Sequence, residues 1–167
     1  ELGDAAVVTA WLDGGGHIDA TIDLLTIDAR IGTPGIDATI GTTAGSVILR
    51  ACLRGVTLLM LVSLGGHERL LDVLLERGAS LDQQTSDGST ALMLAVQANE
   101  PPCVKALIEA GADLDKANFD GSYPAWFAAD KGYTECLVLL LDAGADWRRA
   151  WTDSRTGTAW TPLANAK

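Results

Sequence analysis

The sequence is short of basic residues. Its 167 residues include 12 lysines and arginines against 22 aspartates and glutamates, so the formal net charge at pH 7 is −10 and the isoelectric point is about 4.4. Proteins that bind DNA, RNA or anionic lipid usually present a basic patch. The charge balance therefore argues against nucleic acid and favours a partner protein that is neutral or basic at the contact.

Histidine is scarce, which limits the available chemistry. The two histidines, His17 and His67, have no cysteine, aspartate or glutamate at a spacing typical of zinc or catalytic sites. The glycine run 14–16 lacks the lysine and the preceding strand of a phosphate-binding loop. We therefore predict no catalytic residues, no metal site and no cofactor, and we expect that the chain is not an enzyme.

Cysteine is also rare, because Cys52, Cys103 and Cys136 are the only three and cannot all pair within one chain. The sequence positions of Cys103 and Cys136 differ by 136 − 103 = 33. We expect both to be small buried residues at equivalent places on two helices. Unpaired cysteines favour an intracellular, reducing compartment.

The sequence also lacks the uninterrupted run of about 20 apolar residues that a transmembrane helix requires. Its most apolar window, 47–64, is interrupted by Arg50 and Arg54. We therefore expect no direct membrane span, although a membrane complex stays open as the partner.

What the chain does contain is a regular sequence period. The pentapeptide that begins at Gly78 returns at Gly111, and its Gly-Ala start returns at Gly144, with 111 − 78 = 33 and 144 − 111 = 33. Leu75 and Ile108 keep the same step, since 108 − 75 = 33. A fixed period of this length is typical of a solenoid built from repeated units.

Each unit contains two helical segments. Aliphatic side chains in 70–75 and 104–108 fall on one face of a helix, which the following glycine ends in a left-handed conformation. Thr57 and Thr90 each follow a glycine by two residues and precede another apolar segment. The predicted order within a unit is turn, helix, turn, helix, loop.

The short turn between the two helices has glycine in two units, Gly66 and Gly132, and Asn99 in the third. Asparagine tolerates positive φ better than most residues, so we expect the same turn geometry in all three. Pro101 and Pro102 then fit the first turn of the second helix, where a missing N–H costs little.

These motifs resemble the ankyrin repeat family, whose repeat runs roughly Gly-x-Thr-Pro-Leu-His, Gly-His, Leu-Leu and Gly-Ala-Asp. The best unit, 54–86, carries Gly55, Thr57, Leu59, Gly66-His67, Leu74-Leu75 and Gly78-Ala79. Where the family usually has histidine after Thr-Pro-Leu, this chain has Met60, Met93 and Trp126, and we expect apolar packing there. The resemblance implies a mostly α-helical solenoid with finger loops between the units.

A shorter repeat lies between the first two units. The tripeptide Ile-Asp-Ala begins at Ile18, Ile27 and Ile36, with 27 − 18 = 9 and 36 − 27 = 9. Each copy alternates apolar and polar residues, as strands do. We interpret residues 26–41 as a β-hairpin inserted between the first two repeats.

The spacing of glycines agrees with an insertion. If Gly15 is equivalent to Gly78, their separation is 78 − 15 = 63, which is 30 more than one period. At the other end, the positions of Tyr123 and Thr161 differ by 161 − 123 = 38, five more than one period. This difference suggests that the first helix of one more unit begins near Thr161, after a finger that is five residues longer.

We therefore expect six segments. They are a partial N-terminal ankyrin-like repeat (1–20), an inserted hairpin finger and connector (21–53), three ankyrin-like repeats (54–86, 87–119 and 120–152) and a degenerate or truncated C-terminal repeat (153–167).

The resemblance implies protein recognition through a concave face built from first helices and fingers. We predict a non-enzymatic protein–protein interaction scaffold whose partner-binding residues are Leu61, Leu64, Gln83, Gln84, Leu94, Gln97, Lys116, Asn118, Phe119, Phe127, Asp130 and Lys131.

Two alternatives stay open. The first is a structural or linker subunit of a large assembly, with membrane association as one option, suggested by the mean hydropathy of +0.19. It would dock through its tryptophan-rich C-terminal end and through the hairpin residues Ile27, Arg30, Pro34 and Ile36. The second is that the chain is part of a longer enzyme whose catalytic domain lies elsewhere.

Overall fold

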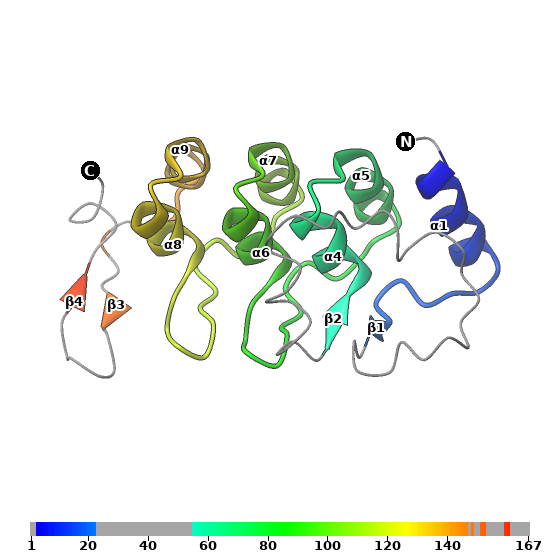
Figure 1. The fold of residues 1–167 in the computed structure, drawn as a ribbon, viewed down its shortest axis with the longest axis horizontal. Coiled ribbons are helices and arrows are strands. Elements are labelled where there is room, and N and C mark those ends of the chain that lie inside the picture. The colour runs from blue at the N-terminus through cyan, green and yellow to red at the C-terminus, as the bar shows by residue number, and fades with distance from the viewer. Residues whose placement is uncertain (1–2, 23–54, 147, 149–150, 153–158, 161–167) are drawn as a thin grey trace.

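Three pairs of helices stack side by side in the structure, a computed structural model (Figure 1). It describes residues 3–22, 55–146, 148, 151–152 and 159–160. The pairs are α4 (Leu58–Leu64) with α5 (Glu68–Glu76), α6 (Ala91–Ala98) with α7 (Pro101–Glu109), and α8 (Pro124–Lys131) with α9 (Thr134–Asp142). The remaining described elements are α1 (Gly3–Asp13) and the short strands β1 (Thr21–Ile22), β2 (Val56–Thr57), β3 (Trp151–Thr152) and β4 (Ala159–Trp160).

The helices form two rows. The first helices of the pairs contact one another in the order α4, α6, α8, and the second helices do so in the order α5, α7, α9. Helix α1 packs against α5 and so stands in the row of second helices. The predicted mostly α-helical solenoid is confirmed. Among the described residues, no helix has the length and apolar character needed to cross a membrane.

The first helices begin at the positions that the sequence predicts. The Oγ1 atoms of Thr57 and Thr90 accept hydrogen bonds from the backbone N–H groups of Met60 and Met93, each at 3.3 Å. These are N-cap hydrogen bonds, which satisfy donors that the helix itself cannot. Met60 and Met93 are buried as expected, and the sulfur of Met60 also accepts the N–H of Thr57 at 3.4 Å.

The turn between the helices has the predicted geometry. Asn99 ends α6 with φ 56° and ψ 53°, in the left-handed region that Gly132 occupies after α8 with φ 72° and ψ 27°. The N–H of Glu100 then bonds the carbonyl of Ala95, which satisfies an acceptor at the end of the helix. Pro101 follows at the first turn of α7, as predicted.

The loops between helix pairs, here called fingers, all close at the same place. Each closing pair begins at the same offset from the glycine that follows a second helix: 22 − 15, 85 − 78, 118 − 111 and 151 − 144 are all 7. The pairs are Ile22 with Val56, Thr85 with Ser89, Asn118 with Ser122 and Trp151 with Trp160.

The chain between the two residues of a closing pair is the tip of the finger. Counting the residues between each pair gives 56 − 22 − 1 = 33 for the first tip, 89 − 85 − 1 = 3 for the second, 122 − 118 − 1 = 3 for the third and 160 − 151 − 1 = 8 for the last. The first and last tips therefore exceed the others by 30 and by 5, the numbers expected from the period. The additional chain enters at a tip, where it leaves the register of the helices unchanged.

The first copy of the nonapeptide, 18–22, is not strand-like along its length. Ile18 and Asp19 lie in a turn, and only Thr21–Ile22 is a strand. The carboxylate of Asp19 accepts the backbone N–H of Ser80 at 2.8 Å, which holds it at the start of the first finger. The predicted hairpin at 26–41 lies outside the described residues, as does the helix expected from Thr161.

One carboxylate per unit joins each finger to the next. Asp82 accepts the N–H of Asp113, and Asp115 accepts the N–H of Asp146, each at 3.0 Å, as Asp19 does for Ser80. We call this row of three hydrogen bonds the aspartate ladder. Its repetition shows that the N-terminal unit stacks in the same register as the others.

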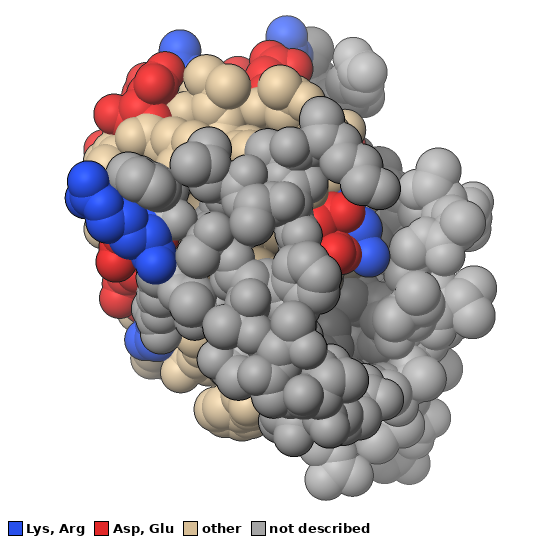
Figure 2. Space-filling view, turned by 90° about the vertical axis from the view of Figure 1, so that its left-hand side faces the viewer, with Lys and Arg blue, Asp and Glu red and all other residues tan. Residues whose placement is uncertain are grey.

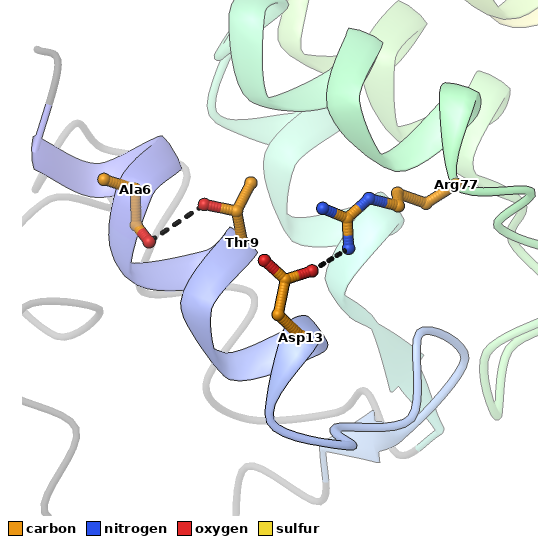
Figure 3. Close-up of polar contacts among 4 residues, drawn as sticks. All are labelled: Ala6, Thr9, Asp13 and Arg77. Carbon is orange, nitrogen blue, oxygen red and sulfur yellow. Dashed lines mark hydrogen bonds and ion pairs between the residues drawn. The ribbon is translucent and has the colours of Figure 1, made fainter.

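A surface ion pair also joins α1 to α5. Nη1 of Arg77 lies 2.7 Å from Oδ1 of Asp13, and within α1 the Thr9 hydroxyl donates to the carbonyl of Ala6 at 2.9 Å (Figure 3). The side chains of Arg77 and Asp13 are 40% and 63% exposed, so solvent screens the attraction. Burial of Val8 against the core is the larger reason for α1 to dock.

Because the insertion enters at a tip, it should be removable. Replacing residues 23–55 by the tripeptide tip Ser-Asp-Gly of the second finger should leave one cooperative transition in urea unfolding followed by circular dichroism. The shorter loop has a smaller entropic cost of closure, which favours the folded state by about 2 kcal/mol. As a control, replacing 21–57 by Gly-Ser-Gly also removes the strand pair and the Thr57 cap, and should lower the midpoint. Loss of cooperativity in the first variant would contradict the prediction.

The aspartate ladder predicts a graded effect of mutation. Asp82→Ala should lower the free energy of unfolding by about 1 kcal/mol, because the N–H of Asp113 loses its acceptor. Asp82→Asn keeps an acceptor oxygen and should cost less, and Asp72→Ala on the exposed face of α5 should stay within about 0.5 kcal/mol of wild type. Equal urea midpoints for Asp82→Ala and Asp72→Ala would show that the ladder contributes nothing.

Candidate protein-binding surface

The first helices and the fingers share one side of the molecule. In Figure 1 the second helices form the upper row, the first helices lie beneath them, and the fingers project below. We call this surface the finger face and define it as α4, α6 and α8 with finger residues 80–89 and 113–122. It contains all twelve predicted partner-binding residues.

The predicted residues differ in access to solvent. Leu61 and Leu94 are only 3% and 2% exposed and belong to the hydrophobic core cluster, so their side chains do not reach the surface. The exposed ones are Gln84, Phe119, Asp130 and Lys131, and the partly buried ones are Leu64, Gln83, Gln97, Lys116, Asn118 and Phe127. The binding role of all twelve stays a prediction. The hairpin residues Ile27, Arg30, Pro34 and Ile36 lie outside the described residues.

Three of the predicted finger residues make hydrogen bonds inside the chain. Nε2 of Gln84 donates to the carbonyls of Gly88 at 2.7 Å and of Ala117, in the next finger, at 3.2 Å. Nζ of Lys116 donates to the carbonyl of Asp82 at 2.9 Å, and Oδ1 of Asn118 accepts the N–H of Ser122 at 2.8 Å. These side chains therefore fix the fingers in place before any partner arrives.

The tip of the second finger holds a polar network that sequence reasoning missed. The carboxylate of Asp87 accepts the hydroxyls of Thr85 and Ser89, the latter at 2.8 Å, and the N–H of Ser89 at 3.3 Å. The N–H of Ser89 also bonds the Thr85 hydroxyl at 3.0 Å. The sequence Thr-Ser-Asp-Gly-Ser could have predicted this network, because short polar side chains readily form hydrogen bonds with nearby backbone groups in turns.

Phe119 is the most exposed large hydrophobic residue among those described, at 74%. Its backbone N–H donates to the carbonyl of Asp87 in the neighbouring finger at 3.0 Å. A Cβ atom added at Gly88 would lie 2.7 Å from the Phe119 N and 2.9 Å from its Cδ1. The start of the ring thus rests on the bare backbone of Gly88, and most of its surface faces solvent.

A second aromatic group lies on α8. The rings of Trp126 and Phe127 meet edge to face, with centroids 6.4 Å apart, and Nζ of Lys131 stands 5.5 Å from the Phe127 centroid. Nζ of Lys131 is also 3.1 Å from a carboxylate oxygen of Asp130. The charge of Lys131 is therefore partly balanced within the chain.

The charge at the C-terminal end of the solenoid is mixed. Figure 2 looks onto this end, and on the part of it that the structure describes, acidic and basic side chains lie close to one another.

Among the described residues, no group of three or more His, Cys, Asp or Glu is arranged to hold a metal ion. A shallow hollow beside α1 is lined by Leu12, Gly16, His17, Ile18 and Arg77.

Comparison with known families agrees with this architecture. The chain matches the family model described as "Ankyrin repeats (3 copies)" over residues 36–118 and 58–150. The second match alone, 58–150, spans more than half of the 167 residues. A search of curated proteins gave no match.

The two described cysteines occupy equivalent buried places, as predicted, Cys103 on α7 and Cys136 on α9. Burial raises the pKa of the Cys103 thiol to about 12, and the nearby charge of Glu100 adds to the shift. Burial also raises the pKa of Cys136 to about 11, with smaller contributions from Glu135 and Glu100. Both thiols therefore stay protonated in the fold well above their ordinary pKa of 9.0.

These shifts predict a loss of stability in alkali. The folded state keeps both protons while the unfolded state releases them above pH 9, so ionisation favours unfolding as the pH rises past that value. Each thiol contributes a slope of up to about 1.4 kcal/mol per pH unit. Urea unfolding between pH 8 and 10.5 should show a shallower decline for Cys103→Ala/Cys136→Ala than for wild type. Identical slopes would contradict the burial of the thiols.

Proposed function

Because the chain belongs to the ankyrin repeat family, we propose that it is a non-enzymatic scaffold that binds a partner protein through the finger face. Ankyrin repeats generally mediate protein–protein interaction and are typically non-enzymatic. The observation that carries the proposal is the common register of the fingers, which aligns three units into one continuous surface. The net charge of −10 favours a partner that is neutral or basic at the contact.

The accessible row on the first helices is Leu64, Gln97 and Asp130. They are equivalent residues, since 97 − 64 = 33 and 130 − 97 = 33, and each is exposed or partly buried. The neighbouring row of Leu61, Leu94 and Phe127 is buried in its first two members and contributes mainly to packing. A partner would therefore touch the row that begins at Leu64.

Pre-organisation supports binding through the fingers. The bonds from Gln84 to Ala117 and from Phe119 to Asp87 tie two adjacent fingers together across a unit boundary. Loops held in this way lose less conformational entropy when a partner binds. The alternative, a structural subunit docking through the hairpin and the tryptophan-rich end, rests on residues that lie largely outside the described part, and it stays a prediction.

Site-specific photo-cross-linking tests which face binds. A benzophenone amino acid placed at Gln97, on the finger face, should give a cross-linked adduct of one defined mass in extract from the source cells. The same group at Lys105, on the opposite side in α7, should give none, because both positions are accessible but only one lies on the proposed surface.

Two controls complete this test. Excess unlabelled chain should compete the adduct away, and thermal unfolding should show that both labelled variants are folded. An adduct that forms from position 105 and not from position 97 would overturn the finger face as the binding surface.

A further inference from the structure

The tips of the second and third fingers carry an aromatic ring beside acidic groups, and we infer that this place binds an arginine side chain of the partner protein. The ring is that of Phe119, and the acidic residues in the same two tips are Asp87 and Asp120. The inference rests on the proposed function and adds the chemistry of the contact. We call residues 86–88 and 119–121 together the tip pair.

The tip pair is held rigidly by contacts within the chain. The bond from the Phe119 N–H to the carbonyl of Asp87 joins the two tips at 3.0 Å, and the N–H of Gly121 donates to the carbonyl of Asn118 at 2.9 Å. Gly88 has φ +85° and leaves room for the Phe119 backbone and ring. Because the backbone of this exposed aromatic side chain is already held, binding costs less conformational entropy than it would on a mobile loop.

The charge along the described fingers is strongly negative, and the tip pair itself contains Asp87 and Asp120 but no lysine or arginine. The described finger residues 16–22, 80–89, 113–122, 146 and 148 contain seven aspartates against one lysine and one arginine, a balance of 2 − 7 = −5. Lys116, the lysine among them, already donates to the carbonyl of Asp82. A cationic side chain is therefore the complementary ligand for this edge of the molecule.

Arginine fits the tip pair better than lysine does. Its planar guanidinium can lie flat on an aromatic ring and still donate paired hydrogen bonds to a carboxylate in the same plane. Phe119 offers the ring, and the adjacent Asp120 is exposed and carries a carboxylate. A lysine ammonium could satisfy the charge but not the stacking.

The chain has two phenylalanines, which permits a direct measurement. Labelling the full chain with 4-fluorophenylalanine gives two ¹⁹F resonances, one from exposed Phe119 and one from Phe127 beside Lys131. Titration with acetylated tetra-arginine amide at physiological salt should shift the Phe119 resonance saturably and the Phe127 resonance little. Tetralysine amide of the same charge should require a higher concentration for the same shift.

Mutation then separates the ring from bulk charge. In anisotropy titrations with fluorescein-labelled tetra-arginine, Phe119→Leu should weaken binding by about two- to fivefold, the range of an exposed cation–π contact. Val138→Ala removes an exposed apolar side chain on α9, outside the finger face, and is the control that should leave binding unchanged. Equal binding of both peptides, with no effect of Phe119→Leu, would mean attraction by net charge only and would overturn the inference.

The two proposals fail in different ways. If the Gln97 photo-adduct forms but Phe119→Leu changes nothing, the scaffold stands and the arginine contact falls. If Phe119 responds to arginine but no adduct forms at position 97, the tip pair binds a cation while the first helices do not take part in the scaffold.

Discussion

The constraint that the whole structure shares is a common register, which one hydrogen bond marks at each junction between units: a backbone N–H at the start of a finger donates to the aspartate of the unit before it. A backbone N–H is a strong donor that needs an acceptor, and a carboxylate at a fixed position supplies one. Asp19, Asp82 and Asp115 therefore hold successive units at the same offset. This offset brings equivalent apolar faces of the helix rows together, from Leu71 through Leu140.

The constant place of the closing pairs explains how the fingers can differ so much in length. The closing pairs keep their place in every unit, whereas the first tip has 33 residues and the second has 3. The entropic cost of closing a loop rises only with the logarithm of its length, so the long first tip costs about 2 kcal/mol more than a three-residue tip. The solenoid can therefore carry an insertion without losing its register, and the strand pair of β1 and β2 is the feature that makes this possible.

The sequence predicted the parts of the structure that follow from spacing and from backbone preference. The repeat period follows from the spacing of equivalent residues along the chain, whereas the left-handed turn at Asn99 and the buried thiols of Cys103 and Cys136 follow from a preference of the residue type. The hydrogen-bond partners of the polar side chains could not be predicted from the sequence. Gln84 and Lys116 looked available to a partner, but both bond carbonyls in an adjacent unit. The place of Asp19 in the aspartate ladder could have been predicted, because its separation from Asp82 along the chain, 82 − 19 = 63, equals that of Gly15 from Gly78.

Comparing equivalent residues of successive units indicates which residues are available to recognise a partner. Residues that maintain the register recur once per period, because each unit needs the same bond, so they carry little information about a particular partner. A residue that departs from the period at an exposed position is not required by the stack. Phe119 is such a residue, since its equivalent one unit earlier is Ser86, with 119 − 86 = 33, and a serine there closes the finger equally well. Because 74% of Phe119 faces solvent, its ring adds little to the packing of the stack and is accessible to a partner.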